Sequence, residues 1–282
     1  MTSPLAGRRV ARMNGAGNKI LVLDQRGGFA LPTPAQARAV HAAPGLDYDQ
    51  MMVLADPRTA GTLAYMAIYN NDGSLAGACG NGTRCVADRL ARQTGARRLT
   101  VETDRGLIAC ERLGESTYRA DMGAPRLAGA EIPFAGADDT IAATIPGAES
   151  YGPAGLVNMG NPHAVFFVPD LAAVDLAEAG PPLETHPLFP EKANISFAQI
   201  LAPGRIRLKV WERGVGATLA CGSAACATLV AAVRRDLSPR EAQIELPGGT
   251  LDIGWREADG HVMMTGPVAF EREIELTASL FA

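Results

Sequence analysis

The sequence lacks a large excess of charge of either sign and has no long apolar run. Lys and Arg number 26 against 30 Asp and Glu, which gives a net charge of −4 and a pI near 5.6. That balance lacks the basic surplus of nucleic-acid-binding proteins. No apolar segment approaches the roughly 20 residues of a membrane-spanning helix. The first 13 residues lack the apolar core of a secretory signal. We therefore expect a cytoplasmic protein that binds neither nucleic acid nor membrane.

Cysteine is also sparse, with five in 282 residues, and an odd number does not suggest a disulfide framework. Cytosolic thiols are expected to stay reduced. Cys79 and Cys85 are separated by five residues, and Cys221 and Cys226 by four. Both pairs fall at expected helix starts rather than in the paired turns of a zinc site. We expect no metal site.

What the chain does contain is a repeat with a period of half its length. Cys79 and Cys221 are each followed by glycine and lie 142 positions apart. Other landmarks recur at offsets of 142 to 144, and the pairs are Asn18 with Asn161, Gln50 with Asn194, Asn70 with Glu212, and Gly106 with Gly249. Such a nearly constant offset predicts two domains with one topology.

Each half shows the same order of structural signals. A helical pattern follows each cysteine, over residues 81–94 and 223–235, and Gly95 is a typical C-terminal cap. A hairpin signal follows each helix, with turns at residues 104–106 and 247–249. We predict an α+β fold of two pseudo-symmetric domains, each a curved, mostly antiparallel sheet around a central helix. The predicted ranges are 1–123 with 266–282 for the first domain and 124–265 for the second.

The two thiols suggest an acid–base pair. A free thiol has a pKa near 8.5, and a position at a helix N-terminus lowers it. If the two halves face each other, two thiols across one cleft can remove a proton from one face of a carbon and deliver one to the other, without a cofactor. The amides of two opposed helix N-termini can hold a carboxylate. Cys85, Cys110 and Cys226 are instead expected to be buried small side chains.

At these residues the chain resembles the diaminopimelate epimerase family, which works without pyridoxal phosphate. The resemblance covers nearly the whole chain, and the motifs that carry it are residues 13–18, 70–74, 79–85, 159–163 and 212–222. It implies the interconversion of LL- and meso-2,6-diaminopimelate in lysine and peptidoglycan precursor synthesis. It also implies a two-domain fold that closes over the substrate.

The resemblance assigns roles residue by residue. Cys79 and Cys221 match the acid–base pair, and His163 with Glu212 match residues that influence the pKa values of the thiols. The implied substrate contacts are Asn18, Gln50, Asn70, Gly80, Asn81, Asn161, Asn194, Glu212, Arg213, Gly222 and Ser223. Arg213 offers a forked donor for a distal carboxylate. We expect diaminopimelate as the small-molecule partner, no cofactor and no metal, and a homodimer on base rates alone.

The chain departs from the family pattern in places. Asn14 stands where many members have histidine, and Ser223-Ala224 replaces a common Thr-Gly, so Ala224 must tolerate the local backbone conformation. Three alternatives stay open: a proline or hydroxyproline racemase of related plan, a thiol switch without catalysis on the same fold, and a binding protein for a diamino acid.

Overall fold

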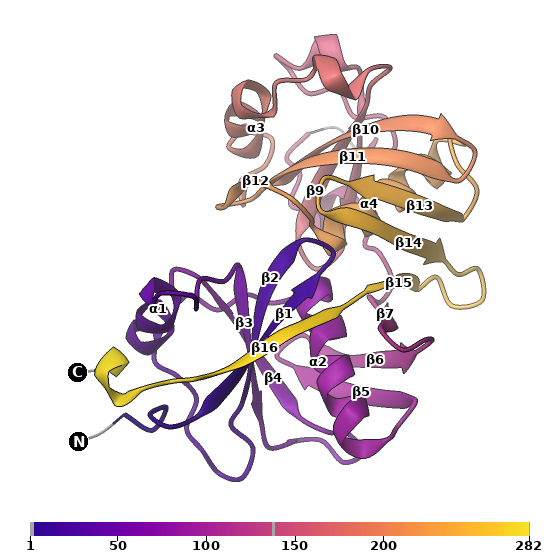
Figure 1. Cartoon of the computed structure of the whole chain (residues 1–282). Coiled ribbons are helices and arrows are strands. Elements are labelled where there is room, and N and C mark those ends of the chain that lie inside the picture. The colour runs from indigo at the N-terminus through magenta and orange to yellow at the C-terminus, as the bar shows by residue number, and fades with distance from the viewer. Residues whose placement is uncertain (1–2, 137–138, 282) are drawn as a thin grey trace. The chain divides into compact units, whose positions relative to one another are not determined.

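The computed structural model describes residues 3–136 and 139–281, so the ends of the predicted ranges at Met1 and Ala282 lie outside it. The chain divides into two compact units (Figure 1). Residues up to 120, together with those from 266 onward, form the first, called here the Cys79 unit. Residues 121–265 form the second, the Cys221 unit.

The Cys79 unit holds one sheet in the order β16-β1-β2-β3-β4-β5-β6-β7. Strands β2 and β3 are parallel, as are β4 and β5, and the other neighbouring strands in this order are antiparallel. The elements are β1 (Arg9–Gly15), β2 (Asn18–Asp24), α1 (Pro34–Ala42), β3 (Gln50–Ala55), β4 (Tyr65–Asn70), α2 (Gly80–Thr94), β5 (Arg98–Thr103), β6 (Gly106–Arg112), β7 (Thr117–Asp121) and β16 (Ala269–Glu275).

The Cys221 unit repeats this plan. Its sheet runs β15-β14-β13-β11-β10-β9-β8, with β12 paired to β11. Here β9/β10 and β11/β13 are the parallel pairs. The elements are β8 (Ala154–Asn158), β9 (Pro162–Phe167), α3 (Leu176–Glu184), β10 (Asn194–Ala202), β11 (Arg205–Glu212), β12 (Gly216–Thr218), α4 (Gly222–Arg234), β13 (Glu241–Leu246), β14 (Gly249–Trp255) and β15 (Val262–Pro267).

One helix lies at the centre of each sheet. Helix α2 contacts β1, β2, β3, β5 and β6, and α4 contacts β8, β9, β10, β13 and β14. A single helix can touch strands so far apart in the order only if the sheet curves around it. The predicted fold class is therefore confirmed. Both hairpins form at the predicted turns, and α2 ends at Gly95 in the left-handed conformation with φ 73°.

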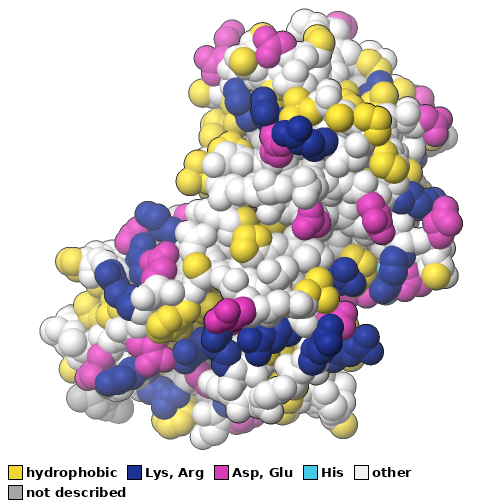
Figure 2. All heavy atoms as spheres, turned by 45° about the vertical axis from the view of Figure 1, so that its right-hand side comes forward, with side chains coloured by type: hydrophobic (Ala, Val, Ile, Leu, Met, Phe, Trp, Pro, Cys, Tyr) yellow, Lys and Arg dark blue, Asp and Glu magenta, His cyan; other side chains and the backbone are white. Residues whose placement is uncertain are grey.

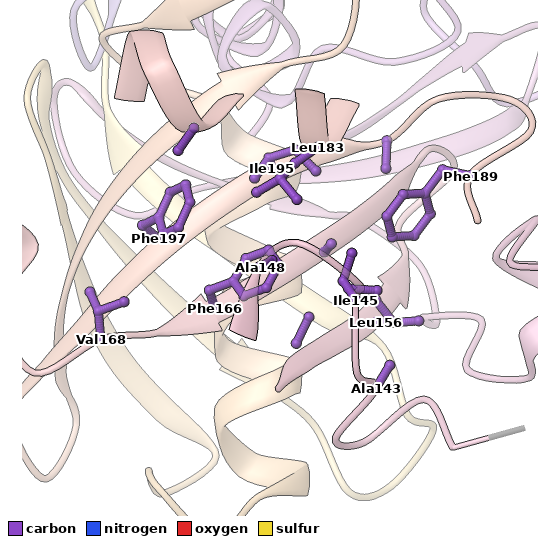
Figure 3. Close-up of a cluster of buried hydrophobic side chains, with 14 of the residues drawn as sticks. Ala143, Ile145, Ala148, Leu156, Phe166, Val168, Leu183, Phe189, Ile195 and Phe197 are labelled. Carbon is purple, nitrogen blue, oxygen red and sulfur yellow. The ribbon is translucent and has the colours of Figure 1, made fainter. Parts of the chain in front are cut away.

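The other face of each sheet carries a second apolar layer. In the Cys221 unit Phe166 stacks on Phe197 at 5.4 Å between ring centroids, and Ile195 and Leu183 lie in the same cluster (Figure 3). Because side chains alternate along a strand, the neighbours of Phe166 in β9 face the opposite side, toward α4. This alternation places His163 on the helix side of the sheet, since Ala164 belongs to the apolar cluster.

The sequence interpretation missed helices α1 and α3. Helix α1 begins with a recognisable sequence pattern, because Thr33 and Gln36 form a capping box and Pro34 lies in the first turn. Helix α3 is capped by Asp175 but contains Pro181 and Pro182, which normally break a helix. Its formation therefore depends on packing, against β10, β11 and β12.

Charged side chains of both signs are intermingled on the face shown in Figure 2. In the described chain Glu245 pairs with both Arg205 and Arg207, and Asp47 pairs with both Arg12 and Lys19. Within residues 3–136 and 139–281, no helix is both long and apolar enough to cross a membrane.

Candidate active site

Three polar side chains meet at one edge of the sheet in the Cys79 unit. Asn18 opens β2, Gln50 opens β3 and Asn70 closes β4. Because β2 and β3 are parallel and β4 runs antiparallel to β3, all three positions fall at the same edge. Gln50 is the register partner of Asn70, and its Nε2 lies 3.5 Å from the Asn70 Oδ1. The topology thus gathers residues that are 52 positions apart in sequence.

Cys79 lies at that edge as the N-cap of α2. Its backbone is extended, with φ −151° and ψ 100°, and its carbonyl accepts the first helical hydrogen bond from the Thr83 amide. The Gly82 amide donates to Sγ at 3.2 Å, and Sγ lies 2.9 Å from the Gln50 Oε1 and 4.0 Å from the Asn18 Oδ1. The partly exposed thiol is therefore positioned by a helix N-terminus and two side-chain amides.

The first turn of α2 packs tightly on the sheet. A Cβ on Gly82 would lie 2.4 Å from the Met52 Sδ, and one on Gly15 would lie 3.0 Å from the Asn81 carbonyl oxygen. Asn81 is 2% exposed, and its Oδ1 accepts from the Arg84 Nη2 at 3.0 Å. Glycine at positions 15 and 82 therefore allows a close approach that a side chain would obstruct.

The Cys221 unit gathers its predicted residues at the equivalent edge. Asn161 directly precedes β9, Asn194 opens β10 and pairs in register with His163, and Glu212 closes β11. The Asn194 side chain is engaged with backbone: Nδ2 donates to the Pro162 carbonyl at 2.9 Å, and Oδ1 accepts from the Arg213 amide at 3.0 Å. Asn194 therefore joins the start of β9 to the residue that follows β11.

Cys221 is the N-cap of α4, but its environment differs from that of Cys79. The residue is only 6% exposed, and its side chain makes no capping bond to the helix. Its Sγ lies 3.5 Å from the Ser223 Oγ. Burial raises the pKa of the Cys221 thiol well above its usual value, and the negative charge of Glu212 raises it further. At this thiol the lowering of the pKa expected from a helix N-terminus is outweighed by desolvation.

His163 reaches this thiol through two intervening residues. His163 Nε2 lies 2.9 Å from the Asn161 Oδ1, and the Asn161 Nδ2 donates to the Ser223 Oγ at 3.4 Å. Burial, with a smaller contribution from the charge of Arg213, lowers the pKa of His163 to about 3. The imidazole is therefore neutral at physiological pH. Because Nε2 faces an amide oxygen, it carries the proton.

Glu212 and Arg213 lie at the tip of the β11–β12 hairpin. The Thr218 hydroxyl donates to the Glu212 Oε1, and the Arg213 Nη1 donates to the Glu191 carbonyl at 3.0 Å. Gly214 adopts a positive φ of 76° at the turn. The hairpin tip thus carries a carboxylate and a guanidinium on consecutive residues.

Sequence reasoning missed three residues that hold the site together. Asp49 accepts from the Asn18 Nδ2 and the Lys19 amide, both at 2.8 Å. Thr218 holds Glu212, and Glu184 binds the hairpin from α3. Asp49 adjoins Gln50 and carries a weak sequence signal, whereas Glu184 is far from the cysteines in sequence and carries none. In the described part of the chain, no group of three or more His, Cys, Asp and Glu is placed to hold a metal ion.

The chain matches the family model "Diaminopimelate epimerase" over residues 10–128 and 155–271. It is 55% identical to a diaminopimelate epimerase from Methylocella silvestris, covering 99% of this chain and 98% of the relative. It is 51% identical to one from Methylorubrum populi and 48% identical to one from Afipia carboxidovorans, with the same coverage of both chains in each case.

Solved structures share the fold at low identity. A hydroxyproline epimerase from Agrobacterium vitis aligns with a TM-score of 0.70 and 15% identity, over 95% of this chain and 92% of that one. A phenazine biosynthesis protein of the PhzF family from Bacillus anthracis aligns with a TM-score of 0.68 and 16% identity, over 95% and 98%. At such identities the likeness extends to the fold alone.

Proposed function

Because the chain belongs to the diaminopimelate epimerase family, we propose that it interconverts LL- and meso-2,6-diaminopimelate. The observation that carries the proposal is the full-length match at about half identity to three diaminopimelate epimerases. The geometry supports it, since each unit presents one cysteine at a helix N-terminus beside a polar sheet edge. We propose that the two units are the two halves of the epimerase, one for each thiol.

The proposed reaction uses the two thiols as acid and base. One sulfur, as thiolate, takes the α-proton, and the electron pair of the C–H bond moves toward the α-carboxylate. The other thiol then gives its proton to the opposite face of the same carbon. The enzyme ends with the protonation states of the two sulfurs exchanged, so the reverse reaction uses the same site. This chemistry requires both thiols to reach one α-carbon from opposite sides, and it requires no pyridoxal phosphate.

The helix N-termini are suited to hold the reacting carboxylate. Amides in the first turn of a helix carry partial positive charge, and they bind anions. Gly80 and Asn81 open α2, and Gly222 and Ser223 open α4. Fixed amide dipoles also stabilise the negative charge that develops on the carboxylate in the transition state. We assign the α-carboxylate to these amides.

The distal end of the substrate carries a second carboxylate and a second ammonium. Arg213 supplies donors for the carboxylate and Glu212 an acceptor for the ammonium, and both lie on one hairpin tip. Asn18, Gln50, Asn70, Asn161 and Asn194 complete the proposed polar contacts. A cyclic substrate with a single carboxylate would leave this charged pair unused, which favours diaminopimelate over proline.

We further propose that the enzyme works in the cytoplasm, where lysine and peptidoglycan precursors are made, and that it forms a homodimer. The dimer rests on the frequency of two-fold oligomers among soluble enzymes. Sedimentation equilibrium of the purified chain would measure it directly, and a mass near the 29.5 kDa of one chain would overturn it.

The decisive test of the proposed function is solvent deuterium incorporation under reducing conditions. LL-diaminopimelate in D2O should gain deuterium at one α-carbon as the meso isomer appears, while L-proline in a parallel reaction should gain none. Exchange into proline alone would move the chain to the racemases of cyclic amino acids. Absence of exchange into either compound, with reduced thiols and intact fold, would overturn the proposal in favour of binding or a thiol switch.

A further inference from the structure

We propose that Glu184 is a positioning residue that fixes the β11–β12 loop and thereby the two charged side chains that bind the distal end of the substrate. The inference rests on the proposed function for the identity of that substrate. Glu184 is the last residue of α3 and only 7% exposed. A buried carboxylate must be paired or hydrogen-bonded to be stable, and its partners show what it holds.

The two carboxylate oxygens of Glu184 accept from two different donors. Oε2 accepts from the Trp211 Nε1 at 2.7 Å, and Oε1 accepts from the Gly214 amide at 2.9 Å. These two donors flank Glu212 and Arg213 in the sequence. The exposed ammonium of Lys192 lies 3.7 Å from Oε1 and adds little, because water screens it. The carboxylate therefore connects both sides of the loop tip.

The segment that follows Glu184 strengthens the same attachment. The Glu184 carbonyl accepts from the Ala193 amide, the Glu191 carbonyl accepts from the Arg213 Nη1, and the Asn194 Oδ1 accepts from the Arg213 amide. The last two of these bonds hold the loop at Arg213, in addition to the two contacts of the Glu184 carboxylate, and the first ties the segment to the end of α3. Of the residues that hold the loop, Glu184 provides the side-chain charge.

Helix α3 also shapes the position of the Trp211 indole. A Cβ on Gly180 would lie 2.5 Å from the Trp211 ring, so glycine at this position lets the indole lie directly on the helix. Trp211 packs against the apolar cluster that contains Leu183. The ring is therefore fixed by packing, while its N–H is directed to Glu184.

A carboxylate suits this role because it offers acceptors on both oxygens. Glu184→Gln keeps the shape but replaces one oxygen with an NH2 group, so either the indole N–H or the Gly214 N–H faces a donor. Loss of a hydrogen bond to a buried charge corresponds to about tenfold in an equilibrium constant. The Thr218 hydroxyl still holds the Glu212 carboxylate within the hairpin, so the loss should fall mainly on Arg213. Because Arg213 is assigned to the distal end of the substrate, the loss should appear in KM more than in kcat.

The test compares Glu184→Gln with Glu245→Gln, a matched control whose carboxylate pairs with Arg205 and Arg207 in the same unit. We expect KM for diaminopimelate to rise about tenfold in Glu184→Gln with kcat within about threefold, and both constants to stay at wild-type values in the control. In a Trp211→Phe background, Glu184→Gln should raise KM by less than it does in the wild-type background. The indole donor is then gone, and the single remaining side-chain oxygen can accept from the Gly214 amide.

Amide hydrogen exchange of residues 211–216 in the absence of substrate gives an independent readout. We expect faster exchange in Glu184→Gln and unchanged exchange in Glu245→Gln. Wild-type exchange together with wild-type KM, or a fall in kcat at constant KM, would overturn the proposal. If the wild-type chain fails to turn over diaminopimelate, the proposed function fails, while the exchange rates still decide whether Glu184 holds the loop.

Discussion

The two units place a cysteine at the same point of the same topology, yet the two thiols have different surroundings. Cys79 is partly exposed, accepts a hydrogen bond from the Gly82 amide and lies 2.9 Å from the Gln50 Oε1. Cys221 is buried beside Glu212, and its pKa is raised by burial and by that charge. A common local motif therefore does not impose common surroundings on the thiol, because distant residues provide the charge and the burial.

This difference matters for a two-base reaction. One thiol must begin the turnover ionised and the other protonated, and two identical environments would not favour either arrangement. A raised pKa favours the protonated form of Cys221, which suits it to the role of the acid in one direction of the proposed reaction.

The helix starts differ as well. Gly82 in α2 is packed against Met52, whereas the equivalent position in α4 is Ala224. Ala224 lies in the first turn of α4 and is absent from the residues with positive φ. The departure from the family pattern at Ala224 therefore places no strain on the backbone.

The largest effect is expected from removing either thiol. Cys79→Ala and Cys221→Ala should each lower epimerisation by at least about 10³-fold, because each removes the proton donor or acceptor on one face. The remaining thiol can still remove and return a proton on its own face. Each variant should therefore catalyse deuterium exchange of one isomer without inversion, and the two variants should prefer opposite isomers.

Cys110→Ala is the control, because Cys110 is a buried strand residue of β6. Its turnover should match that of the wild type. Epimerisation at the wild-type rate by the Cys79→Ala protein would exclude the two-base assignment.

A smaller effect is expected from removing the charge beside Cys221. In Glu212→Gln the negative charge that raises the pKa of Cys221 is gone, so that pKa should fall toward its ordinary value. A lower pKa means more thiolate at pH 8. Alkylation of Cys221 by iodoacetamide, followed by mass spectrometry of its peptide, should accelerate several-fold, and the rate should level off at lower pH than in the wild type.

Glu178→Gln, at an exposed position of α3 in the same unit, should leave the alkylation rate unchanged. Identical alkylation profiles for Glu212→Gln and the wild type would show that Glu212 does not set the proton affinity of Cys221.

The smallest effect concerns the helix starts. Gly82→Ala should lower the free energy of unfolding by about 1–3 kcal/mol, since the new methyl group overlaps the Met52 sulfur. The reverse change in the other unit, Ala224→Gly, should cost about 1 kcal/mol through lower helix propensity alone. Urea denaturation measures both. A Gly82→Ala protein as stable as the wild type would show that α2 and β3 can separate at no cost.

Much of the fold was predictable because its signals are local. Turn residues define both hairpins, a glycine in the left-handed conformation ends α2, and glycine-flanked cysteines mark both central helices. The repeat of these signals at a constant offset predicted the pseudo-symmetric fold. The polar residues of the candidate site were also accessible, because each stands at the end of a strand whose position the repeat marks.

Other features could be decided only by the tertiary structure. Helix α3 forms despite Pro181 and Pro182, because Trp211 and the apolar cluster pack against it. Asn194 bonds to backbone on both sides, and His163 is neutral because it is buried. The sequence by itself determined where each thiol sits on its helix, since capping and turn geometry depend on neighbours in the chain. The proton affinity of each thiol depends on its exposure to solvent and on charges brought close from other strands. Only the folded chain determines that exposure and those charges.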